Sequence, residues 1–189
     1  MACDLSLGRK EPCKDVVGGI KAVYFADFGD FGTVTYTAGT DIIATLGSAL
    51  TVLQYDVKGN SSFEQNITSS RENGTTFFEQ TLNLTLHKLT KEDNKELKLM
   101  AYGRPHILVE DYNSNVFVMG LQNGADVSGG TIVTGAAMGD LSGYTLTFSG
   151  MEKVPANFLA NTITEGIPET PTAQITAAGV STITPGSNS

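Results

Sequence analysis

The residues that could take part in chemistry are few in this 189-residue chain, and they are scattered along the sequence. There are two histidines, His87 and His106, and two cysteines, Cys3 and Cys13. A structural zinc site needs about four converging nitrogen or sulfur ligands, and the two histidines do not have metal-ligand spacing. We therefore expect no metal, two structural or exposed histidines, and two free thiols in a reducing compartment.

Adjacent carboxylates occur twice, but neither pair suits acid–base catalysis or calcium binding. Glu110 and Asp111 lie in an expected strand, where neighbouring side chains point to opposite faces and cannot converge on one substrate. Glu92 and Asp93 suit the first turn of a helix, where the helix dipole favours negative charge. Asp140 is flanked by glycines and is expected to make an Asx-type turn. The chain has no Gly-x-Ser-x-Gly motif and no P-loop, so we expect no enzyme and no cofactor.

The chain is acidic, with a formal net charge of −8 and a sequence pI near 4.6. A protein that grips nucleic acid needs clusters of Lys and Arg, and the 12 basic residues form no patch outside the expected helix. No apolar run approaches ~18 residues, and no signal peptide is visible at the N-terminus. These features argue against a nucleic-acid clamp and against a membrane-spanning protein.

Apolar and polar residues alternate most regularly over Thr75–Leu89. Such a period of two predicts a long strand with one buried face and one wet or interfacial face. The buried face is expected to carry Phe78, Leu82, Leu84 and Leu86, and the other face Asn83, Thr85 and His87.

One helix is predicted over Lys91–Tyr102, directly after this strand. Thr90 can cap its N-terminus, with Asp93 three residues further on. Gly103 and Pro105 end it.

The remainder reads as short strands separated by turns rich in Asn, Asp and Gly. The segment 42–50 has apolar residues near helical spacing, and both helix and strand stay open there. Phe28 and Phe31 are expected to anchor an aromatic turn on the core. The expected strands are Ile20–Phe25, Thr33–Thr37, Thr51–Val57, Phe63–Ser69, Ile107–Asp111, Val116–Met119, Thr131–Ala137 and Tyr144–Ser149, with turns at 122–124, 128–130 and 139–143.

Three parts are expected along the chain: an N-terminal arm over 1–17, a β-sandwich domain over 18–160, and a mobile C-terminal tail over 161–189. The tail has no aromatic residue and no Lys or Arg from Thr162 onward, so it cannot bury enough apolar area to offset its ordering entropy. Within it, Ile175 and Val180–Ile183 could add a strand to a partner.

The region from Phe77 to Leu159 resembles the major tail tube proteins of long-tailed (sipho- or myovirus-type) bacteriophages. The resemblance is carried by the order of EQTLNLTLHKL, KEDNKELKLMA, RPHILVEDYNSNVFVMG, GADVSGGTIVTGAAMGD and GYTLTFSGMEKVPANFL. These motifs are structural, and the family has no catalytic residues to carry over.

The resemblance implies an all-β fold, a β-sandwich or ring-forming β-barrel, with one short flanking α-helix. It implies six-fold rings of identical subunits that stack into a virion tail tube through which DNA passes without specific binding. Subunits would be made in the host cytoplasm and would contact other tail proteins such as a tail terminator, baseplate or tape measure. Segments that order on assembly would be 2–17, Val57–Thr76 and the tail, with candidate inter-ring contacts at Lys58, Asn60, Phe63, Arg71 and Glu72.

Negative lumen walls would suit such a channel, because they repel phosphate and lower sliding friction. Asp56, Glu64 and Glu79 flank expected strands and are candidates to face the lumen, or else they are ordinary surface acids. Alternatives for the whole chain are another structural virion component, such as a tail-completion ring or decoration protein, or a β-sandwich carbohydrate-binding module. The absence of Trp weighs against the carbohydrate module, which usually presents exposed aromatic rings.

Overall fold

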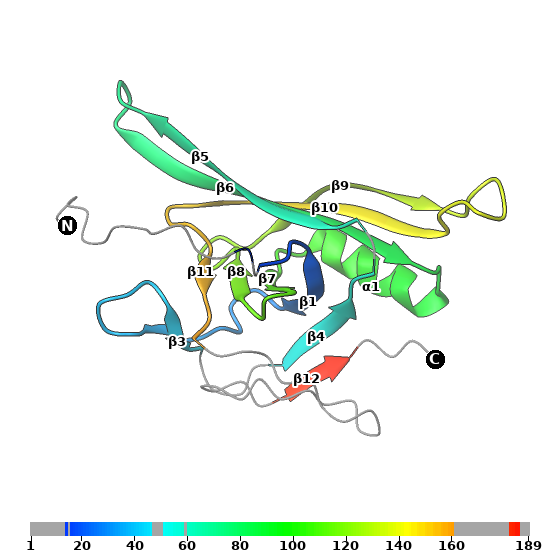
Figure 1. The fold of residues 1–189 in the computed structure, drawn as a ribbon, viewed down its shortest axis with the longest axis horizontal. Helices are drawn as coiled ribbons and strands as arrows, with labels where there is room; N and C mark the ends of the chain where they lie inside the picture. Colours follow the sequence, from blue (N-terminus) through cyan, green and yellow to red (C-terminus); the bar gives the residue numbers. More distant parts are fainter. Residues whose placement is uncertain (1–13, 15, 47–50, 59, 161–181, 186–189) are drawn as a thin grey trace.

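A computed structural model describes residues 14, 16–46, 51–58, 60–160 and 182–185, and this part of the chain is mainly β-sheet with one helix (Figure 1). A six-stranded sheet has the order β11-β8-β7-β1-β4-β12, a four-stranded sheet has the order β5-β6-β10-β9, and β2 pairs with β3. The elements are β1 Ile20–Ala26, β2 Thr35–Tyr36, β3 Ile43–Thr45, β4 Thr51–Asp56, β5 Ser62–Ser70, β6 Thr75–His87, α1 Lys91–Tyr102, β7 His106–Asp111, β8 Val116–Met119, β9 Asp126–Val133, β10 Gly143–Glu152, β11 Asn157–Phe158 and β12 Thr182–Pro185.

The six-stranded sheet is covered on both faces, which explains why β1 and β7 are buried at nearly every position. On one face, Val23 of β1 belongs to a core cluster with Leu82 of β6 and Phe148 of β10. On the other face, Tyr24 packs with Phe31 and with residues of the β2–β3 segment. The two large sheets therefore pack face to face around one core, and a second core lies outside them.

Strand β6 confirms the alternation expected from the sequence. Leu82 and Leu84 are buried, whereas Asn83 and Thr85, which alternate with them, face away from the core and are half-buried. The register with β10 places Phe148 opposite Leu82, so the apolar positions of both strands share one face.

Helix α1 has the bounds that the sequence predicts. The hydroxyl of Thr90 accepts a hydrogen bond from the backbone N–H of Asp93 at 3.1 Å. The N–H of Gly103 donates to the carbonyl of Leu99 at 3.0 Å and ends the helix. Within the described ranges, no helix has the length and apolarity needed to cross a membrane.

The region after β8 differs from the expected strand at 131–137 and the expected turn at 128–130. Strand β9 runs from Asp126 to Val133 and includes Gly129 and Gly130. Gly130 lies against β10, where an added Cβ would be 2.6 Å from the carbonyl oxygen of Thr145. The two glycines therefore permit a close strand pairing with a bulge at Ser128 instead of a turn.

One open question is answered, and two further expectations need correction. The open segment at 42–50 forms strand β3 over Ile43–Thr45, and residues 47–50 lie outside the described part. The expected strand at 33–37 is reduced to the two residues of β2. Neither large sheet closes into a barrel in the described part, because each has a linear strand order with two edges.

The segments expected to order only on assembly are partly ordered in the single chain. Within Val57–Thr76, β5 pairs with β6 along its whole length. The strand expected to join a partner is β12, which instead pairs in parallel with β4 of its own chain and covers that edge. Residues 1–13, with Cys3 and Cys13, and residues 161–181 lie outside the described part.

Candidate functional site

The face of the four-stranded sheet that points away from the core, here called the outer face, is a polar surface. The six-stranded sheet and α1 both lie on the opposite side of this sheet (Figure 1). Alternation along each strand sends most apolar residues inward and leaves mainly polar side chains outside, with Phe77 and Met151 as apolar exceptions and His87 at the end of β6. The outer face carries Ser62, Glu64, Asn66 and Thr68 of β5, Glu79, Thr81, Asn83 and Thr85 of β6, Thr145, Thr147 and Ser149 of β10, and Thr131 of β9.

Hydrogen bonds between side chains tie this surface together across the strands. The hydroxyl of Thr147 donates to the amide oxygen of Asn83 at 3.0 Å, and the amide nitrogen of Asn83 donates to the hydroxyl of Ser62 at 3.5 Å. A second row joins the hydroxyls of Thr131 and Thr145. Cross-strand pairs of this kind stabilise a sheet. Because these polar groups hydrogen-bond to one another, few of them remain available to bind a ligand.

The charge on the outer face is negative. Strands β5, β6, β9 and β10 contain no lysine or arginine. Their carboxylates outside the core are Glu64, Glu79 and Asp126. Because Glu64 pairs with Thr81 and Glu79 pairs with Asn66, the two glutamates are diagonal neighbours on one face.

The three acids predicted for a lumen are thus separated by the structure. Glu64 and Glu79 are brought together, whereas Asp56 ends β4, which pairs with β1 in the other sheet. Asp126, at the start of β9, pairs with Ser149 and adds a third carboxylate to the outer face. Sequence reasoning missed Asp126 because it expected turns at 122–124 and 128–130 and no strand between them.

The predicted inter-ring residues lie at two ends of the β5–β6 hairpin. Arg71 and Glu72 are exposed in the turn at its tip, and Lys58 and Asn60 are exposed near its base. Phe63 does not belong with them. It is half-buried, and its ring lies 5.8 Å from that of Phe117 inside the protein, because it falls on the inward-facing side of β5.

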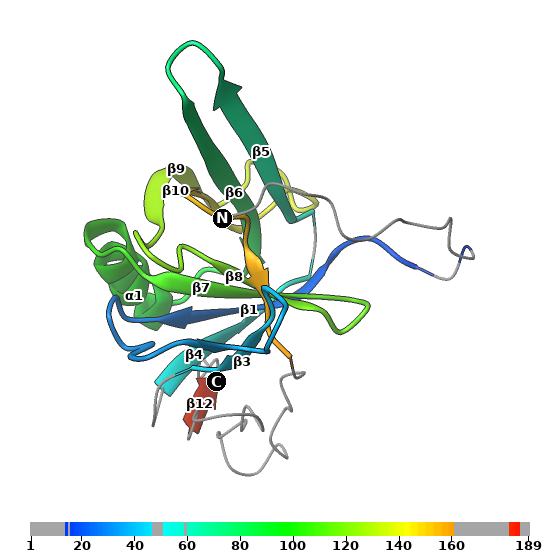
Figure 2. The same cartoon turned by 90° about the vertical axis from the view of Figure 1, so that its left-hand side faces the viewer.

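The outer half of this hairpin projects beyond the rest of the protein, as both views show (Figures 1 and 2). Its inward-facing row continues past Gln65, whose side-chain oxygen accepts a hydrogen bond from the N–H of Ala156 at 2.7 Å. The next pair in this row is Ile67 and Phe78, and Ile67 is 69% exposed. A core-like apolar row therefore runs out onto a projecting surface.

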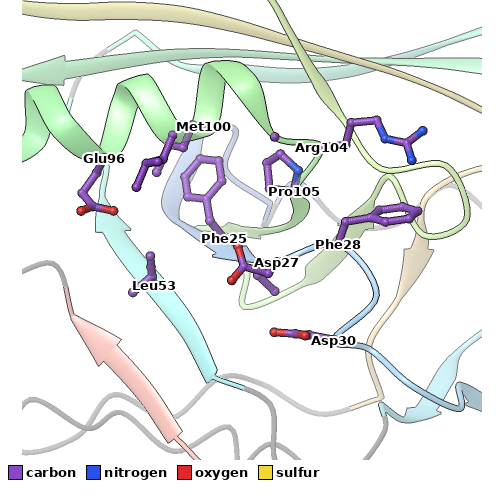
Figure 3. A pocket seen from close by; sticks show the side chains of 12 residues that line it. Phe25, Asp27, Phe28, Asp30, Leu53, Glu96, Met100, Arg104 and Pro105 are labelled. Atoms are coloured by element: carbon purple, nitrogen blue, oxygen red, sulfur yellow. The ribbon is translucent and has the colours of Figure 1, made fainter.

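A cavity of about 400 Å³, here called the α1 cavity, lies beside α1 and the ends of β1 and β4 (Figure 3). Its apolar lining includes Phe25, Leu53, Met100 and Pro105, and three carboxylates border it, those of Asp27, Asp30 and Glu96. The guanidinium carbon of Arg104 lies 4.6 Å from the centroid of the Phe28 ring at the same cavity. Among the described residues, no group of three or more His, Cys, Asp and Glu side chains could hold a metal ion.

His106 fixes the turn that forms one wall of this cavity. Its Nε2 accepts a hydrogen bond from the N–H of Gly29 at 3.1 Å, and its Nδ1 lies 2.6 Å from the carbonyl oxygen of Gly120. Nε2 is therefore unprotonated and Nδ1 is the donor, which is the neutral ring. Burial lowers the pKa of His106, although the Gly120 hydrogen bond and the charges of Glu152 and Asp30 act in the opposite sense. Of the two histidines expected to be structural or exposed, His106 is buried and hydrogen-bonded and His87 is exposed.

Compared with protein-family models, with curated proteins and with solved structures, the chain finds no match. Its function is therefore inferred from its own residues and their arrangement.

Proposed function

We propose that the chain is a structural subunit that assembles with copies of itself into stacked rings, forming the tail tube of a long-tailed bacteriophage. The observation that carries the proposal is the outer face of the four-stranded sheet, a broad hydroxyl- and amide-rich surface with acids and without lysine or arginine. In the proposed assembly this face lines the channel.

The charge of the outer face supports a conduit for DNA. Phosphate binding requires Lys and Arg, which these strands do not have, whereas Glu64, Glu79 and Asp126 repel the DNA backbone. Threonine, serine and asparagine side chains bonded to one another offer few unpaired groups to a passing base. DNA would therefore pass without being held.

Sheet edges and the projecting hairpin support assembly with copies of the same chain. Strands β5 and β9 are the two edges of the four-stranded sheet, and edge strands carry backbone groups free to pair with another chain. Joining β9 of one copy to β5 of the next would extend the sheet around a ring. The apolar pair of Ile67 and Phe78 would then be covered by a neighbour.

The fold in the proposal is a β-sandwich with one flanking helix, of the tail-tube type. The chain itself would carry no catalytic or cofactor site. Its partners would be its own copies and the proteins that begin and end the tail, such as a baseplate, tape measure and terminator, within the virion.

Sedimentation velocity over a concentration series, with and without linear duplex DNA, tests the proposal. We expect species larger than one chain whose share rises with concentration, with DNA sedimenting independently of them. A single-chain species at every concentration, or stable binding of DNA by the chain or its assemblies, would overturn the proposal.

A further inference from the structure

The α1 cavity combines an apolar interior with an uneven charge at its border. The carboxylates of Asp27, Asp30 and Glu96 lie on it, and the single cation beside them, Arg104, is directed to the face of Phe28 (Figure 3). Among the described residues, none of these three carboxylates forms an ion pair. A cavity of this kind suits a long side chain with an apolar stem and a positive end.

The tip of the β5–β6 hairpin, residues 71–74, offers such a side chain. Arg71 and Glu72 stand next to each other in the turn, both are exposed, and neither forms an ion pair among the described residues. The tip thus carries a positive and a negative charge side by side, and the α1 cavity presents carboxylates beside an arginine. The two sets of charges are complementary.

The tip and the α1 cavity cannot meet within one copy. The tip lies at the far end of the projecting hairpin, well away from α1 in both views (Figures 1 and 2). Any contact between them must therefore join two copies. Because the two surfaces are different, the contact is head-to-tail, and repeating it gives closed rings or open stacks.

We propose that the α1 cavity receives the hairpin tip of a second copy of this chain, with Arg71 entering between the carboxylates and Glu72 facing Arg104. This inference rests on the proposed self-assembly and specifies one of its contacts. The α1 cavity, which lies outside the outer face and is not filled by core side chains, would then be occupied by a neighbouring copy.

A contact with a neighbouring copy accounts for the length of the hairpin. The core contacts of β5 end near Gln65, and the strands then continue for several residues with an exposed Ile67. Strand extension of this kind contributes little to the stability of a single chain, but it moves the charged tip outward to where a neighbour can be reached.

A charge-swap experiment tests the contact. Arg71→Glu places a negative charge among the carboxylates, and Asp30→Lys places a positive charge opposite Arg71. Each variant should raise the protein concentration needed for assembly about tenfold or more, because like charges then face each other. The double variant restores opposite charges and should recover most of the assembly. Lys88→Glu, which makes the same charge change as Arg71→Glu at an exposed site away from the tip, should assemble as the native chain does.

Thermal unfolding of each variant checks that the fold is kept. The inference is overturned if Arg71→Glu assembles like the native chain, or if the double variant assembles no better than the single variants. These results are distinct from a failure of the proposed function, in which the native chain itself would not assemble.

Discussion

The imidazole of His106 stacks on the ring of Phe31, with the ring centroids 4.2 Å apart and the planes inclined by 14°. Phe28 stacks on the same imidazole at 5.0 Å. The Gly29 and Gly120 hydrogen bonds then hold both ring nitrogens. One buried histidine thus organises the aromatic turn at 27–32 and, through it, a wall of the α1 cavity.

This arrangement predicts a loss of stability in mild acid. The pKa of His106 is lowered in the folded protein by burial, whereas the unfolded chain has the ordinary value of about 6.5. As pH falls, the His106 of the unfolded state binds a proton before that of the folded state does. The stabilisation that the neutral, buried His106 gives the fold is therefore complete above about pH 6.5 and is lost as pH falls from there through the folded pKa.

Urea unfolding at pH 8, 7, 6 and 5 measures this effect. His106→Gln should be less stable than the native chain at pH 8 by about 1–3 kcal/mol, because the ring contacts are lost. Its free energy of unfolding should then vary less between pH 7 and 5. His87→Gln, at the exposed histidine, serves as the control and should follow the native profile. Parallel profiles for the native chain and His106→Gln would refute the account of His106.

Gly143 is predicted to be essential for the pairing of β10 with β6. A Cβ at this position would lie 2.0 Å from the carbonyl oxygen of Leu86, so the backbone would have to move apart. Gly143→Ala should therefore lower the free energy of unfolding by about 3 kcal/mol or more. Gly139→Ala, where an added Cβ meets nothing within 4 Å, should stay within about 0.5 kcal/mol of the native chain. Equal losses of unfolding free energy for the two variants in urea would contradict the register between β10 and β6.

Thr90 is predicted to stabilise α1 through its side chain. Thr90→Ala removes the acceptor for the N–H of Asp93 and should cost about 1 kcal/mol. Thr90→Ser keeps the hydroxyl and should remain near the native stability. The carbonyl of Thr90 also accepts a hydrogen bond from the hydroxyl of Tyr144 at 3.2 Å, and both variants keep that bond. Urea unfolding that finds serine as destabilising as alanine would exclude the capping explanation.

The outer face is predicted to bind DNA once its charge is reversed. The double variant Glu64→Lys/Glu79→Lys should assemble and should retain DNA at low salt, with retention falling steeply as salt rises. Asp41→Lys/Asp56→Lys makes the same change in net charge at exposed positions outside the outer face. Co-sedimentation with DNA compares the two. Equal retention by both variants would show that net charge matters and the position on the outer face does not.

Local sequence patterns predicted the elements whose geometry depends on neighbouring residues. Alternation over β6 is visible because one face is buried and the other is not, and α1 is bounded by the Thr90 cap and by Gly103. Strand β9 was mispredicted for a physical reason. Gly129 and Gly130 usually indicate a turn, but here Gly130 allows β10 to come close, and this partner is distant in the sequence.

The outer face could be predicted only in part. Glu64 and Glu79 were identified, but their position on one face depends on the pairing of β5 with β6, and Asp56 falls on another sheet for the same reason. The α1 cavity was not foreseen, because Asp27, Leu53 and Glu96 come from three separate segments. His106 gave no sign of its role, since its hydrogen-bond partners are backbone groups of Gly29 and Gly120.

Negative-stain electron microscopy of the purified chain at rising concentration tests the central claim most directly. The account predicts rings or tubes of uniform diameter with a stain-filled centre, growing longer or more numerous as the concentration increases. Small solid particles of one chain at every concentration would contradict it.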